Sequence, residues 1–236
     1  MEKSKLQSFI NRYYLGGNCE AVKLQPNGTS VNCDLIDADQ TVVGKIKWNT
    51  TPFAQGELGI NHTGALIKML SAVGENLDIV VKDAQGKNYA MEIKEGKTKM
   101  TFMLADTTVI PAVPAINQEP EYDVTINIDD EFTNKFIKAK NALPDAKNFA
   151  VQVKGGNIVF IINYSTINAD NVTFEVGPTN ITNMDPICFS AEKLKEILNA
   201  NKGDQGKIHV SSQGLARVEF TGGDFESTYW LVQLQN

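Results

Sequence analysis

The feature that most constrains this chain is a pattern of secondary structure that occurs twice. Four segments carry apolar residues at the spacing of an amphipathic helix, so we expect helices over 3–14, 61–73, 130–142 and 191–202. The first and third begin 127 residues apart, and the second and fourth begin 130 apart. Three segments that read as strands follow the second helix, and three follow the fourth. The sequence therefore predicts one unit repeated within the chain.

Between the expected helices, apolar and polar residues alternate with period two, which is typical of half-buried strands. The clearest case is a hairpin over 149–164 that turns at Gly155-Gly156, and a second hairpin is expected around Pro26-Asn27-Gly28. Further strands are expected at 41–48, 77–83, 88–95, 98–105, 122–128, 171–176, 207–213, 215–221 and 226–235. This mixture of helices and antiparallel strands indicates the α+β class.

The segment 107–121 separates the two repeats. It contains three prolines, Pro111, Pro114 and Pro120, and it follows no hydrophobic period. Such a composition is typical of an extended, semi-rigid linker. We therefore predict a first domain over 1–106, a connector over 107–121 and a second domain over 122–236.

Charge is distributed unevenly between helices and the remainder of the chain. The 236 residues hold 22 Lys+Arg against 28 Asp+Glu, for a net charge of −6. The four expected helices hold ten basic and four acidic residues, so they carry +6 and the other segments carry −12. The total excludes a plainly basic nucleic-acid binder. The pattern instead favours a polyanionic partner that touches only the helices.

The basic residues of each helix are expected on the side away from its apolar stripe. The alternative is that these lysines only keep an exposed helix face soluble, and it weakens because all four helices agree in sign. The candidate phosphate-binding residues are Lys3, Lys5, Arg12, Lys68, Lys135, Lys138, Lys195 and Lys202.

Several classes of function find no support in the sequence. No apolar run reaches the ~18–20 residues of a membrane helix, and the first 14 residues lack the apolar core of a signal peptide, so we expect a cytoplasmic protein. The three cysteines, Cys19, Cys33 and Cys188, are not spaced as a metal site. The two histidines, His62 and His209, form no ligand pair. Phosphate-binding glycine loops and an activated nucleophile are also absent, so we expect neither catalysis nor a cofactor or metal.

The repeated unit, the four basic-faced helices and the Pro-rich connector together resemble the DNA sliding clamps, the ring-shaped polymerase processivity factors. The closest types are the two-domain clamps of tailed phages and proliferating cell nuclear antigen. The segment 226–232, with Tyr229 and Trp230, resembles the aromatic last strand of that family. The residues 136–140 followed by 149–158 resemble the start of its second domain. The resemblance spans essentially the whole chain and is architectural.

This resemblance implies a homotrimeric ring of six domains in which twelve helices line the hole. It implies sequence-independent binding of duplex DNA, an ATP-driven clamp loader, and replication proteins, including the polymerase, that dock through short peptides. The family's peptide pocket lies beside the connector. The candidates for it here are Val109, Ile110, Val113, Tyr229, Trp230 and Val232. If the source is viral, the ring would act in the host cytoplasm.

Two other interpretations remain open. One is a monomeric polymerase accessory factor of the same duplicated fold, which binds DNA without encircling it. The other is a structural β-rich viral protein in which the helices only pack. The sequence departs from the family in having only two arginines, Arg12 and Arg217, so phosphate contacts would depend on lysines.

Overall fold

From the first helix of each half of the chain onward, α-helices and strands follow one another in the same order. In the computed structural model, which describes residues 1–235, the first half contains α1 (Lys3–Tyr14), η1 (Leu15–Gly17), β1 (Val22–Pro26), β2 (Val31–Ile36), β3 (Val42–Trp48), β4 (Leu58–Ile60), α2 (Thr63–Leu70), β5 (Asp78–Ala84), β6 (Lys87–Glu95), β7 (Thr98–Met103) and η2 (Thr107–Val109). The second half contains β8 (Val124–Ile128), α3 (Asp130–Ala142), β9 (Asn148–Lys154), β10 (Asn157–Ile162), β11 (Val172–Pro178), β12 (Asn183–Ser190), α4 (Ala191–Ala200), β13 (Gln205–Ser211), β14 (Leu215–Gly222) and β15 (Phe225–Val232). Of these elements, β8, η1 and η2 have no counterpart in the other half.

The chain forms two units. Unit 1 contains Met1–Ala38, Val43–Pro114 and Gly223–Ser227, so it includes the beginning of β15. Unit 2 contains Asp39–Val42, Ala115–Gly222 and the chain from Thr228 onward. The division between Pro114 and Ala115 falls inside the Pro-rich segment.

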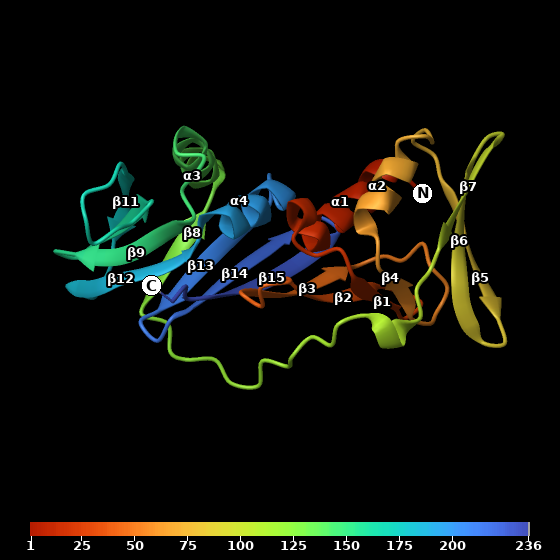
Figure 1. Ribbon diagram of the computed structural model, residues 1–236, viewed down its shortest axis with the longest axis horizontal. Coiled ribbons are helices and arrows are strands. Elements are labelled where there is room, and N and C mark those ends of the chain that lie inside the picture. Colours follow the sequence, from red (N-terminus) through yellow and green to blue (C-terminus); the bar gives the residue numbers. More distant parts are fainter. Residues whose placement is uncertain (236) are drawn as a thin grey trace. The chain divides into compact units, whose positions relative to one another are not determined.

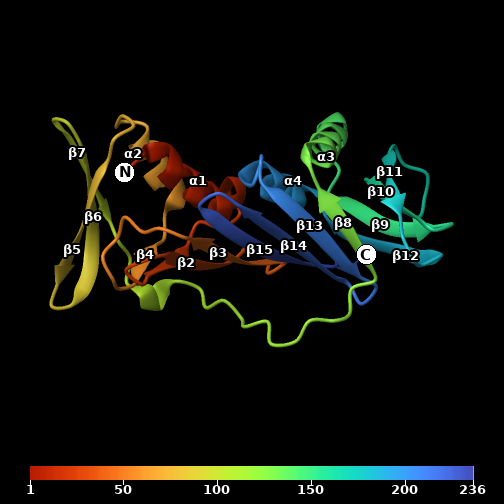
Figure 2. The same ribbon diagram turned by 180° about the vertical axis from the view of Figure 1, so that it is seen from behind.

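In unit 1, α1 and α2 lie side by side on one face of the antiparallel strands β4-β1-β2-β3, and β5-β6-β7 form a separate sheet (Figures 1 and 2). The beginning of β15 is the next strand after β3. The helices form because apolar residues recur on one side, and they bury that side against the strands. The buried side chains of α1 include Leu6, Phe9, Ile10 and Tyr13.

Unit 2 repeats this arrangement with different side chains. The strands β12-β9-β10-β11 form one sheet. A second set of adjacent strands has the order β15-β14-β13-β8, to which unit 2 contributes the end of β15. The core beneath α3 is aromatic: the ring of Phe136 lies 5.3 Å from that of Phe149, and Phe149 lies 5.6 Å from Phe160. Asp129 and Ser190 accept hydrogen bonds from the first turns of α3 and α4, which confirms the expected beginnings of both helices.

Pairing registers show that the two units are equivalent position by position. Leu24, Cys33 and Ile46 lie opposite one another across three strands of unit 1, as Val151, Phe160 and Phe174 do in unit 2. The two-residue turns between β6 and β7 and between β14 and β15 place Gly96 and Gly223 at positive φ, 56° and 53°, and these residues are 127 apart. The expected duplication, with two helices on antiparallel strands in each repeat, is confirmed.

The structure differs from the sequence-based expectations in a few elements. Two strands, β4 and β12, were not expected. β4 has three residues, too few to establish a period. β12 contains Pro186 and a shift in register, and it buries Ile187, Cys188 and Phe189 in succession, so alternation is lost. The expected helices over 61–73 and 191–202 are shorter, since α2 ends at Leu70 and α4 at Ala200.

Candidate functional site: helix faces and connector

Four of the candidate lysines extend into solvent in or next to the helices. Lys68 on α2, Lys138 on α3 and Lys202 just beyond α4 are exposed. Lys135 is also exposed, and its ammonium lies 5.3 Å from the centre of the Phe174 ring. Such cations can contact phosphates without any rearrangement of the fold.

Arg12 is not on the exposed helix face where the helical spacing placed it. Its side chain is buried, Nη1 donates to the carbonyl oxygen of Ser8 at 2.9 Å, and the guanidinium lies 4.2 Å from the centre of the Phe225 ring. The helical period describes only the stripe formed by α1 itself, whereas the beginning of β15 covers a further side of that helix. We therefore assign Arg12 to packing.

The other two candidates on α1 are partly engaged within unit 1. Lys3 donates from Nζ to the carbonyl oxygen of Val73 at 2.7 Å. Lys5 lies 2.8 Å from Asp224, and this hydrogen-bonded ion pair raises the pKa of the lysine. Both positions keep part of the side chain accessible.

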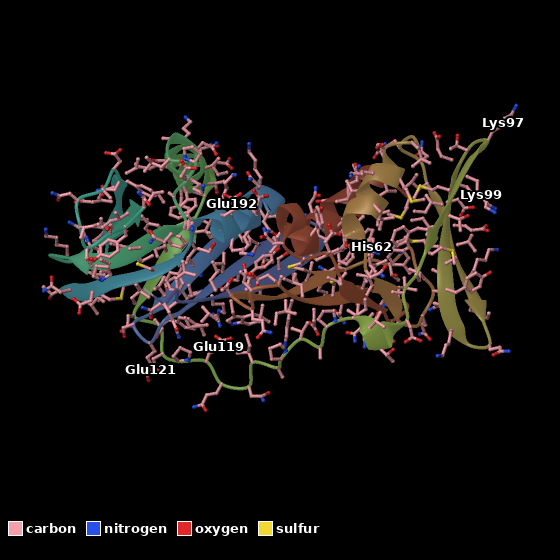
Figure 3. All side chains as sticks on the ribbon, viewed as in Figure 1. His62, Lys97, Lys99, Glu119, Glu121 and Glu192 are labelled. Carbon is pink, nitrogen blue, oxygen red and sulfur yellow. The ribbon has the colours of Figure 1, made fainter. Side chains whose placement is uncertain are left out.

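On α4, Lys195 belongs to a network of charges. It lies 3.1 Å from Glu192 and 3.6 Å from Glu196, and the buried Lys140 of α3 lies 3.3 Å from Glu192. Partial burial opposes ionisation of Glu192, but Lys195 and Lys140 outweigh it and hold the pKa of that carboxyl below its usual value. Figure 3 labels Glu192 on the helix face of unit 2. Lys195 is therefore less available to a phosphate than Lys138.

The connector is attached to unit 2 by Glu119. Its carboxylate accepts from Trp230 Nε1 at 2.9 Å, from Arg217 Nη1 at 2.9 Å and from the Tyr122 hydroxyl at 2.7 Å. Burial opposes the charge of Glu119, but these three hydrogen bonds and the guanidinium hold its pKa below the usual value. Glu119 and Glu192 lie on opposite faces of unit 2 (Figure 3).

The beginning of the connector is attached to unit 1 by Asp106. Its carboxylate accepts from the backbone nitrogen of Thr108 at 3.0 Å and from the hydroxyl of that residue at 2.8 Å, and it lies 3.3 Å from Lys87. These bonds lower the pKa of Asp106 to about 2. They also form the N-cap of η2.

The six candidate pocket residues differ in exposure. Val109 and Val232 are exposed and Val113 is half-buried, so all three can contact a peptide. Ile110 and Trp230 are buried except for 8% and 7% of their surfaces, and Tyr229 is fully enclosed. Tyr229 instead accepts a hydrogen bond at 3.0 Å from the buried Asn201.

Glu119, Tyr122 and Arg217 were missed as a group by the sequence analysis. Arg217 lies 98 residues from Glu119 in the chain, and Glu119 and Tyr122 occur where the sequence has no clear period, so no spacing relates the three. Within residues 1–235 no group of three or more His, Cys, Asp or Glu side chains could hold a metal ion. The described helices include none that is long and apolar enough to cross a membrane.

Together, the duplicated units and their helix pairs define the fold of the DNA sliding clamps. No family model matches the chain, and no curated protein is similar to it in sequence. Among solved structures, it is similar to Archaeoglobus fulgidus PCNA bound to the C-terminal region of FEN-1, with a TM-score of 0.78, 15% identity, and coverage of 100% of this chain and 97% of that one.

Two further PCNA structures agree with this assignment. The protein from Entamoeba histolytica gives a TM-score of 0.74 at 14% identity, covering 99% of this chain and 96% of that one. The PCNA2–PCNA3 complex of Sulfolobus tokodaii gives 0.73 at 12% identity, covering 99% and 97%. At these identities the likeness establishes the fold.

Proposed function

We propose that this protein is a DNA sliding clamp: a homotrimeric ring that encircles duplex DNA and tethers the replicative polymerase and other DNA-processing enzymes. The observation that carries the proposal is the whole-chain likeness to PCNA, one structure of which holds part of FEN-1. The exposed lysines of the helices supply contacts to phosphates that do not depend on base sequence.

The free strand edges support assembly into a ring. Among residues 1–235, β7 pairs only with β6 and β11 pairs only with β10. An edge strand with unpaired backbone groups is a template for another chain. In the proposed ring, β7 of one copy lies beside β11 of the next, and this head-to-tail contact removes both edges when the ring closes.

The tethered enzymes would dock through short peptides near the connector. Val109 and Val113 supply accessible apolar surface in unit 1, and Val232 supplies it in unit 2. Trp230 contributes less, because Glu119 holds its indole nitrogen. Loading onto circular DNA would require an ATP-driven loader, since a closed ring cannot pass over a duplex without ends.

The test combines mass in solution with retention on DNA. The subunit mass is 25.9 kDa, so light scattering should report about three times that value for a closed trimer. The ring should remain on nicked circular duplex after a loader reaction and leave once the circle is linearised. A strict monomer that binds open DNA would favour the accessory factor, and failure to bind DNA at all would favour the structural protein.

The lysine contacts need a separate variant. We expect Lys68→Glu/Lys138→Glu/Lys202→Glu to abolish stimulation of the polymerase at low salt. The matched control, Lys147→Glu/Lys154→Glu/Lys207→Glu, makes the same change of net charge at exposed positions outside the helices. Equal activity of the two triple variants would contradict a DNA-facing role for the helix faces.

A further inference from the structure

Two ion pairs surround the place where β15 lies beside β3 in unit 1. Lys5 of α1 contacts Asp224 at 2.8 Å, in the turn that precedes β15. Lys47 of β3 contacts Glu226 of β15 at 3.1 Å. The lysines belong to α1 and β3, and the carboxylates belong to the beginning of β15 and the turn before it. We call this contact the internal joint.

The residues equivalent to Asp224 and Glu226 in the first repeat are basic. The β6–β7 and β14–β15 turns match with Gly96 equivalent to Gly223, so Lys97 takes the place of Asp224 and Lys99 that of Glu226. Lys97 and Lys99 are exposed, and Lys97 lies at the tip of the β6–β7 hairpin (Figure 3). Lys99 also contacts Glu92 at 2.7 Å.

The residue equivalent to Lys47 in the second repeat is acidic. Lys47 follows Ile46, which faces Cys33, and Glu175 follows Phe174, which faces the equivalent Phe160. Glu175 therefore replaces Lys47 on the exposed side of β11.

The helix position equivalent to Lys5 loses its positive charge in the second repeat. Phe132 of α3 replaces Lys5, and its exposed neighbour is Glu131. Glu131 and Glu175 line a groove of about 370 Å³ beside Phe132 and Phe174, and Lys135 also lines it. Lys135 is also exposed, and its ammonium lies over the Phe174 ring, so Glu131 and Glu175 set two carboxylates against one ammonium at the rim.

We infer that the contact between subunits carries the opposite charge sign from the internal joint: Lys97 and Lys99 of one copy face Glu131 and Glu175 of the next. This inference rests on the proposed ring, and it adds the charges that determine which strand of one subunit pairs with which strand of the next. If β7 of another copy displaced β15 from β3, its lysines would meet Lys5 and Lys47. Like charges would then disfavour that exchanged assembly, while the correct contact is attractive.

The test reverses each side of the subunit contact and then both. In 0.1 M NaCl, Lys97→Glu/Lys99→Glu and Glu131→Lys/Glu175→Lys should each raise the dissociation constant of the assembly at least tenfold, measured by sedimentation and light scattering. The quadruple variant restores complementary charges and should return within threefold of the unaltered protein. The control Lys147→Glu/Lys207→Glu should assemble normally.

Each outcome decides a different point. If the unaltered protein assembles and both reversals leave its dissociation constant unchanged, or the quadruple variant is no tighter than either double variant, the inferred pairing is wrong and the ring stands. If the unaltered protein never assembles, the ring itself fails together with the pairing. Thermal unfolding followed by circular dichroism verifies that each variant is folded, which the exposure of all four residues leads us to expect.

Discussion

The indole nitrogen of Trp230 donates a hydrogen bond to Glu119 at 2.9 Å, which attaches the last strand to the connector. Because Arg217 and Tyr122 contact the same carboxylate, removing its charge weakens three interactions at once. This arrangement makes Glu119 the residue whose replacement most directly releases the end of the connector.

We expect Glu119→Gln to lower the free energy of unfolding by about 1–2 kcal/mol, in the range for partly exposed hydrogen bonds to a charged group. Amide hydrogen exchange at 115–121 should accelerate in the same variant. Glu121→Gln is the matched control, since Glu121 is exposed and two residues away. Equal exchange in both variants would show that the carboxylate does not hold the connector.

The attachment should also depend on pH. Glu119 has a lower pKa in the folded chain than its usual value of 4.5, so its contribution is complete above that value and disappears as the pH falls through the folded pKa. The indole N–H resonance of Trp230 in a 15N-edited NMR spectrum should therefore shift with a midpoint below pH 4.5. A Glu119→Gln protein should lack this step, and its persistence there would assign the titration to another group.

Replacing Arg12 tests whether this residue packs within unit 1 or contacts DNA. Because its guanidinium is buried over Phe225, Arg12→Ala should lower the free energy of unfolding by about 2–3 kcal/mol. Retention on circular DNA at 20 °C should remain within twofold of the original, provided that the variant is folded. A selective loss of DNA retention at unchanged stability would return Arg12 to the list of phosphate contacts.

Tyr229 and Val232 should separate stability from peptide docking. Tyr229→Phe removes a buried acceptor of the Asn201 amide and should destabilise the protein by about 1 kcal/mol with unchanged binding of a polymerase-derived peptide. Val232→Glu places a charge on an exposed residue, so it should weaken peptide binding at least tenfold and change stability little. Fluorescence anisotropy with a labelled peptide measures the binding affinity of the two variants. Weaker binding by Tyr229→Phe than by Val232→Glu would contradict the proposed pocket.

The repeated fold was predictable because its signals are local. The apolar period places α1 and α3 at their observed bounds, and glycine turns mark the hairpin at Gly155-Gly156. β4 and β12 were missed, since a three-residue strand has no period and Pro186 interrupts the alternation of β12. These strands are defined by the neighbours they pair with, which no local pattern reveals.

The candidate site was only partly predictable for a related reason. Helical spacing places Lys68 and Lys138 on exposed faces, as observed, but it cannot foresee that β15 covers Arg12. The aromatic pattern of the last strand does not distinguish the enclosed Tyr229 from the exposed Val232. The Glu119 cluster joins residues 98 and 111 positions apart, so only the folded chain brings them together.

The attachments and prolines of the connector have a consequence for its thermodynamics. Asp106 holds one end on unit 1, Glu119 holds the other on unit 2, and Pro111 and Pro114 restrict the backbone between them. Because each proline removes backbone conformations, the connector has less conformational entropy to lose on peptide binding than a chain of the same length without prolines. The part of the binding cost that comes from ordering the connector would therefore be small, while the peptide still loses its own freedom.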